Sequence, residues 1–341
     1  MKAADTGTGG MGAVGLGSAP PGPVTLSCGR IGIVQIPQLG RRPPDDVVMV
    51  HGLGANLGFW YATAVEHFRR FGRVTLFDLP GHGDSEMPET GYSPAALAGV
   101  LEELLDHLGI ERAHLVAHSF GGSVALAFAI AHPERVKSLV LADVRLWAVE
   151  PPRLPDEASP RVQRLRDAGL TLADDRYDVS VQVLVELARL RIASDEPMAA
   201  IGEIMPGARG LFSGRRTARK WLKLVDTTHA YREMTDAATL LLEDVARIEL
   251  PMLLVYGAHS SCARSAEALV SLCRRARLQV IPDVGHFFPL TRPHLFARIA
   301  LGYQRSIERA RRRRARRAAA AIAAGDTVDD TAAATLVPQD S

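Results

Sequence analysis

Short apolar runs alternate with amphipathic stretches along most of the chain. The stretches with helical periodicity lie at Phe59–Phe71, Pro94–Leu108, Ser123–Ala131 and Ala263–Arg274. The apolar runs between them lie at Val47–Val50, Val74–Phe77, His114–Ala117, Ser138–Leu141, Met252–Val255 and Leu278–Ile281. Runs of this kind are typical of parallel strands covered on both faces. The alternation predicts an α/β fold with a mostly parallel central sheet flanked by helices.

Two segments depart from this rhythm. Short β-branched runs on either side of Cys28-Gly29 predict an opening hairpin between Pro23 and Gln38. Residues 146–235 contain helical stretches, such as Val179–Ile192 and Arg215–Val225, and no apolar run of the earlier kind. A helical block of this size predicts a cap inserted over the strand ends.

The remaining boundaries follow from composition. Residues 1–22 are rich in Gly, Ala and Pro and predict a flexible leader. Residues 23–145 and 236–308 are expected to form the α/β core, with 146–235 as the cap. Residues 309–341 are expected to form an Arg/Ala-rich tail.

Composition and charge narrow the class of protein. The chain has 341 residues, of which 47% are hydrophobic and 23% charged, as in folded globular proteins. From Arg305 onward eight arginines face five acids, a net charge of +3 that leaves the rest of the chain at −1 within the total of +2. The body therefore lacks the basic footprint of a nucleic-acid-binding protein. The run from Arg309 to Arg317 is expected to be a solvated helix end, although it could touch nucleic acid or anionic lipid.

Cysteine usage and hydropathy bear on the compartment. Cys28, Cys262 and Cys273 have no CxxC or Cys/His spacing and are expected to be reduced thiols, not a disulfide framework or a zinc site. No apolar run approaches the roughly 20 residues that a membrane span needs. The first residues also lack the apolar core of a signal peptide. These features predict a cytoplasmic protein without a membrane span.

The sharpest chemical signal is Ala117-His118-Ser119-Phe120-Gly121-Gly122, between an apolar run and an apolar helix. Its glycines permit an abrupt turn that exposes the serine, as in the G-x-S-x-G nucleophile elbow, with alanine in the first glycine position. Upstream, His51-Gly52-Leu53-Gly54 follows the run Val47–Val50. A turn here can direct the N–H of Leu53, together with that of Phe120, at a tetrahedral oxyanion.

A serine hydroxyl needs a base, and His286 is the best candidate among the eleven histidines. It follows the final apolar run by a short loop and comes last in the chain order serine, acid, histidine.

Together these motifs resemble the α/β-hydrolase superfamily, from about Val47 to Gly302, with a helical cap insertion. The segment Asp78-Leu79-Pro80-Gly81-His82-Gly83-Asp84-Ser85 is also similar to a family turn that is mainly structural, so Asp84 and Ser85 receive no catalytic role.

The resemblance leaves the acid of the triad open. The commonest family position for it, in a G-x-x-D pattern, corresponds here to Ser260. Some members place the acid where Asp143 stands, after the run Ser138–Leu141, and we expect Asp143 to orient His286.

The resemblance implies a serine hydrolase that cleaves an ester or thioester of a largely apolar acyl substrate through an acyl-enzyme. The substrate is a small molecule or a carrier-bound acyl group, and no cofactor or metal is implied. Apolar cap residues are expected mainly to pack the cap and secondarily to meet the substrate: Leu184, Leu187, Leu190 and Met205. The alternatives are a C–C bond hydrolase, an acyltransferase and a non-catalytic ligand-binding protein. Substrate identity and oligomeric state stay open.

Overall fold

The computed structural model describes residues 22–40, 45–157, 159–193, 202, 205, 207 and 214–324. Within them, the main sheet has seven strands in the order β3-β5-β4-β6-β7-β8-β9. The strands are β3 (Ile33–Ile36), β4 (Asp45–Val50), β5 (Gly72–Phe77), β6 (Ala113–His118), β7 (Val136–Ala142), β8 (Met252–Gly257) and β9 (Ala276–Ile281). All neighbouring pairs are parallel except β3–β5. The predicted α/β class and mostly parallel sheet are confirmed.

The chain opens with the expected hairpin. Strands β1 (Val24–Leu26) and β2 (Gly29–Ile31) pair antiparallel across the turn at Ser27-Cys28. The sequence pattern did not predict the position of β3, which follows the hairpin. β3 joins the main sheet as an antiparallel edge strand beside β5.

Helices pack against the sheet in two groups. One contains α2 (Pro94–His107), α3 (Phe120–Ala131), α10 (Leu242–Ala246) and α11 (Ala263–Leu272). The other contains α1 (Gly58–Glu66), α12 (Phe288–Thr291) and α13 (Pro293–Ala324). Short 3₁₀ turns lie at η1 (Phe68–Arg70), η2 (Pro133–Arg135) and η3 (Ala237–Thr239). The helices bury the central strands, so that Val47, Val48, Met49 and Val50 of β4 have no exposed surface.

One prediction about the sheet is wrong. The run Leu278–Ile281 was expected to be covered on both faces, but β9 is an edge strand, and Leu278 and Val280 are 40% and 46% exposed. An apolar run indicates a strand and does not encode the strand's place in the sheet, which depends on long-range order.

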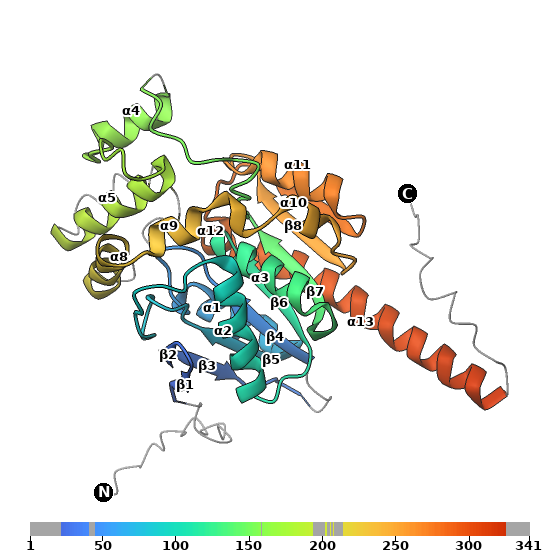
Figure 1. Ribbon diagram of the computed structural model, residues 1–341. Helices are drawn as coiled ribbons and strands as arrows, with labels where there is room; N and C mark the ends of the chain where they lie inside the picture. Colours follow the sequence, from blue (N-terminus) through green and yellow to red (C-terminus); the bar gives the residue numbers. More distant parts are fainter. Residues whose placement is uncertain are drawn as a thin grey trace, which may run out of the picture.

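The segment between β7 and β8 carries the helices of the cap. They are α4 (Pro160–Asp167), α5 (Val179–Ala193), α8 (Arg215–Thr227) and α9 (Ala230–Thr235), which gather on one side of the sheet (Figure 1). The fold is therefore an α/β-sheet domain with an inserted helical cap.

Polar contacts fasten this cap to the core. Lys220 of α8 donates to the backbone carbonyls of His82, Gly83 and Ser85. On the other side, Arg145, just after β7, makes two hydrogen bonds of 2.9 and 3.1 Å to the buried carboxylate of Asp178. Paired guanidinium–carboxylate bonds of this kind fix orientation as well as position.

The two chain ends lie mostly outside the described residues. The predicted flexible leader is described only at Gly22, and the predicted tail only as far as Ala324, where residues 309–324 continue α13. Among the described helices, none combines the length and hydropathy needed to cross a bilayer.

Candidate active site

Ser119 lies at the junction between β6 and α3, where the chain turns sharply. Its backbone has φ 53° and ψ −126°, which is strained for a residue with a side chain. The Ser119 N–H donates to the carbonyl of Ala142 at 2.9 Å, which ties the turn to the end of β7. The predicted strand–turn–helix context of the serine is present.

The two glycines after Phe120 are needed because other segments of the chain lie so close that a side chain would not fit. A Cβ on Gly121 would lie 2.5 Å from the carbonyl oxygen of His51, and one on Gly122 would lie 2.1 Å from Cγ2 of Val144. Side chains at these positions would push α3 away from β4 and from the chain after β7. The first glycine of the common motif is dispensable here, since Ala117 lies within the strand β6 and does not have a positive φ.

The imidazole of His286 connects the serine to a carboxylate. The Ser119 hydroxyl lies 3.0 Å from His286 Nε2, and His286 Nδ1 lies 2.8 Å from Asp143 Oδ1. The carboxylate can only accept, so Nδ1 carries the proton and Nε2 is free to accept from the hydroxyl. The structure thus brings together the three residues that the sequence singled out.

Asp143 directly follows β7 in a left-handed conformation, with φ 53°, and its side chain is fully buried. Three donors surround the carboxylate: His286 Nδ1, the Gly257 N–H at 3.1 Å and the Ser260 hydroxyl. The hydroxyl at the usual family acid position therefore donates to the carboxylate of Asp143. This contact was missed from the sequence, which showed Ser260 only as a missing acid.

Charge and burial shift both pKa values. Burial favours the neutral form of Asp143, but the donors around it outweigh this effect and lower its pKa. Burial likewise favours neutral imidazole in His286, yet hydrogen bonds and negative charge from Asp143 and Cys262 raise its pKa above the ordinary 6.5. The two shifts together favour an ionised Asp143 carboxylate, which stabilises the protonated imidazolium form of His286.

The turn predicted to stabilise an oxyanion lies directly against the serine. A Cβ on Gly52 would lie 2.9 Å from Cβ of Ser119. Among the described residues, neither the N–H of Leu53 nor that of Phe120 donates a hydrogen bond within the protein. Phe120 is the first residue of α3, where helix geometry leaves the N–H without an intrahelical acceptor. Both predicted donors are available to a ligand.

Other buried histidines position the backbone around the site. His51 donates from Nδ1 to the Gly52 carbonyl at 2.8 Å and accepts from the Leu79 N–H at 3.1 Å. His118 donates from Nε2 to the carbonyl of His286 at 3.0 Å, which fixes the loop that carries His286. Burial lowers the pKa of His51 to about 4 and that of His118 to about 3, so both rings stay neutral.

Two further features lie near the site. In the segment 78–85, the Asp78 carboxylate accepts from the N–H groups of Leu57 and Asp84 at 2.7 and 2.8 Å, which holds the turn in place. The second feature is Cys262, whose sulfur lies within 4.8 Å of a carboxylate oxygen of Asp143 and a ring nitrogen of His286. Nothing in the sequence pattern placed this cysteine beside the site.

A hydroxyl, an imidazole and a buried carboxylate in this order can perform acyl transfer. The imidazole can take the hydroxyl proton, and the carboxylate can hold the correct ring orientation. The free N–H groups can stabilise a developing oxyanion.

Comparisons with known proteins support the fold and identify its family. Residues 46–293 match the family described as alpha/beta hydrolase fold. A hydrolase from Paraburkholderia phymatum, 2-hydroxy-6-oxononadienedioate/2-hydroxy-6-oxononatrienedioate hydrolase, is 46% identical over 101 residues, which are 28% of this chain and 35% of the relative. A Caenorhabditis elegans protein, abhydrolase domain-containing protein abhd-5.2, is 37% identical over 101 residues, which are 28% of this chain and 22% of the relative. These matches span only about a fifth to a third of the relatives' lengths.

A solved structure extends the likeness over the fold. The enol-lactonase from Burkholderia xenovorans LB400 superposes with a TM-score of 0.58 at 22% identity, covering 82% of this chain and 98% of that protein. On the match over residues 46–293, the chain belongs to the α/β-hydrolase-fold family.

Proposed function

We propose that the protein is a serine hydrolase that cleaves an ester or thioester of a largely apolar acyl substrate through an acyl-enzyme. Ser119 is the nucleophile, His286 the general base and Asp143 the acid that orients and charges the base. The observation that carries this proposal is the continuous chain of contacts, 3.0 Å from Ser119 Oγ to His286 Nε2 and 2.8 Å from His286 Nδ1 to Asp143 Oδ1.

The reaction follows from these contacts. Ser119 Oγ attacks the acyl carbon while its proton passes to His286 Nε2. The oxyanion is held by the N–H groups of Leu53 and Phe120, and its collapse expels an alkoxide or thiolate that takes the proton from Nε2. Water then attacks the acyl-enzyme as one of its protons passes to Nε2. The second tetrahedral intermediate collapses, Ser119 Oγ takes this proton from Nε2, and the acid is released.

The cap is proposed to define the acyl pocket. Leu187 and Met205 are buried, at 0% and 8% exposure, which favours a packing role for both. Leu184 and Leu190 of α5 are only partly buried and remain available to an apolar acyl group. A neutral apolar chain suits such a surface, because its transfer from water supplies binding free energy.

Other reactions use the same parts. Cleavage of a C–C bond is the second candidate, favoured by the 46% identity over 101 residues to a hydrolase named for a 2-hydroxy-6-oxo dicarboxylate. An acyltransferase would use an alcohol in place of the water that attacks the acyl-enzyme. A non-catalytic ligand-binding protein would leave the serine unreactive, which the unpartnered oxyanion donors and the aligned His286 argue against.

Labelling with a fluorophosphonate probe tests the proposal. Wild-type protein should be labelled at Ser119, and the Ser119→Ala and His286→Ala variants should not be labelled. An exposed serine elsewhere on the surface reacts poorly, since it has no base. A folded wild-type protein that stays unlabelled while a small acyl probe reaches the site would refute an activated serine.

A substrate screen then separates the reactions. Esters and acyl thioesters of increasing chain length should be hydrolysed, with kcat/KM rising as the chain grows. Turnover confined to a 2-hydroxy-6-oxo dienoate would overturn the ester assignment and favour C–C cleavage.

A further inference from the structure

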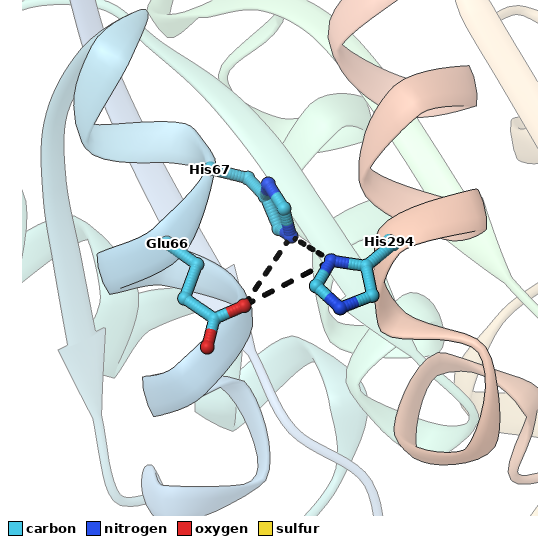
Figure 2. Close-up of side chains that lie close together, drawn as sticks. All are labelled: Glu66, His67 and His294. Carbon is cyan, nitrogen blue, oxygen red and sulfur yellow. Dashed lines mark hydrogen bonds and ion pairs between the residues drawn. The ribbon is translucent and has the colours of Figure 1, made fainter.

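Away from the candidate active site, the end of α1 and the start of α13 bring two histidines and a glutamate together (Figure 2). His67 Nε2 lies 2.9 Å from His294 Nδ1. Glu66 Oε2 lies 3.6 Å from His67 Nε2 and 3.9 Å from His294 Nδ1. The three atoms point at one common spot from segments more than 200 residues apart in the sequence.

The separations suit tetrahedral coordination. A Zn²⁺ ion at about 2.0–2.1 Å from each nitrogen and oxygen ligand holds those ligands about 3.3 Å apart. The observed separations of 2.9, 3.6 and 3.9 Å bracket this value. Small side-chain rotations would equalise them, because the Glu66 and His294 side chains are 55% and 75% exposed.

The charge of the cluster also suits a cation. Arg70 repels a cation at longer range, whereas the Glu66 carboxylate supplies a negative charge inside the coordination sphere, beside the two imidazole nitrogens.

Two other clusters of possible ligands occur among the described residues, and neither is as suitable. Asp143, Cys262 and His286 belong to the candidate active site. In the group of Asp45, His114 and Glu308, the carboxylate of Asp45 already accepts from Lys137 at 2.7 Å. The cluster of Glu66, His67 and His294 has no lysine partner of this kind among the described contacts.

We propose that Glu66 Oε2, His67 Nε2 and His294 Nδ1 bind a divalent transition-metal cation, with Zn²⁺ as the representative ion and water as the fourth ligand. Imidazole and carboxylate form a donor set that Zn²⁺ favours. The ion fastens α1 to α13, which already meet where the rings of Trp60 and Phe296 stack at 5.5 Å. Because it links distant segments, the bound ion stabilises the folded chain.

The test is a Zn²⁺ titration of protein without a histidine tag, in competition with a chromophoric chelator. Wild-type protein should bind one equivalent. His67→Ala and His294→Ala should each weaken binding at least about tenfold, the smallest loss typical of disturbed metal sites. His107→Ala is the matched control, because His107 is an exposed histidine on α2, and it should bind as the wild type does.

Two further measurements keep the outcome clear. Zn²⁺ should raise the melting temperature of the wild type and of His107→Ala, but not that of Glu66→Gln, a conservative change at an exposed side chain. Co²⁺ bound to the wild type should give the visible bands of a tetrahedral nitrogen–oxygen site without a thiolate charge-transfer band.

Three results would overturn the proposal. The first is the absence of saturable binding in folded wild-type protein. The second is one-equivalent binding that both His67→Ala and His294→Ala retain. The third is binding that Cys262→Ser abolishes and His294→Ala does not, which would place the ion beside Asp143. The first two results have no bearing on Ser119 labelling, which tests the proposed function separately.

Discussion

Replacing Asp143 by asparagine should disable the base without disturbing the fold. The carboxylate of Asp143 faces three donors: His286 Nδ1–H, the Gly257 N–H and the Ser260 hydroxyl. An asparagine offers one acceptor oxygen and an NH₂ group, so its NH₂ group would face at least one of these three donors. This conflict is removed most easily when the His286 proton moves from Nδ1 to Nε2. His286 Nε2 can then no longer accept the Ser119 proton.

The expected loss is large. In a triad of this kind the wrong tautomer lowers kcat by about 10⁴-fold, equivalent to about 5.4 kcal/mol of transition-state stabilisation. The backbone should tolerate the change, because asparagine readily adopts the positive φ that Asp143 has, 53°. The acylation rate, measured by stopped flow with an activated ester or as the rate constant of fluorophosphonate labelling, reports the loss directly.

Asp283→Asn is the matched control. Asp283 also has a positive φ, 57°, and is exposed three residues before His286, so this variant should acylate at the wild-type rate. Asp143→Asn protein with a native melting temperature and an acylation rate within about tenfold of wild type would refute the reasoning.

Three other expectations follow from the same contacts. Since Asp143 raises the pKa of His286, kcat/KM should rise with pH as the imidazole deprotonates, with an apparent pKa above 6.5 that falls in Asp143→Asn; a pH–rate profile measures both. Gly122→Ala should lower the free energy of unfolding by about 1–3 kcal/mol in thermal melts, because its Cβ would lie 2.1 Å from Val144 Cγ2. Gly99→Ala is the control: no atom lies within 4 Å of its Cβ, so this change should be neutral or stabilising. Lys220→Met should speed proteolysis within the cap by removing three donor contacts to residues 82–85, and the exposed Lys223→Met on the same helix should not.

Local pattern accounts for most of the sheet. The apolar runs predicted β4, β5, β6, β7 and β8. Parallel central strands are buried on both faces, and such strands consist almost entirely of apolar residues. The edges are different. β9 is apolar yet exposed, and β3 joins the sheet antiparallel, since strand order is set by packing between segments far apart in the sequence.

The candidate site divides in the same way. Ser119 and His286 were predicted from their local sequence context. The serine follows a predicted strand, and the histidine lies in a short loop after the last one. The hydrogen bond from Ser260 to Asp143 joins residues 117 positions apart, and the proximity of Cys262 is equally non-local. Only the adjacency of β7 and β8 brings these groups together.

That adjacency makes the position of the acid exchangeable. Asp143 follows β7 and Ser260 follows β8, and their side chains are in contact at the point where His286 Nδ1 is held. A carboxylate from either strand end can therefore reach the ring, with a hydroxyl from the other as its donor. We expect Asp143→Ser to lose about 10⁴-fold in acylation rate, and the added Ser260→Asp change to recover at least about a hundredfold of that loss.

Ser260→Asp alone separates this explanation from a general gain of negative charge. It would place two carboxylates in contact, and their repulsion raises the pKa of one of them. This variant should therefore be no faster than the wild type. A double variant that is folded but no faster than Asp143→Ser would show that the carboxylate at 143 has a position the β8 end cannot supply. The acid would then be fixed by the geometry of β7 and not by its charge alone.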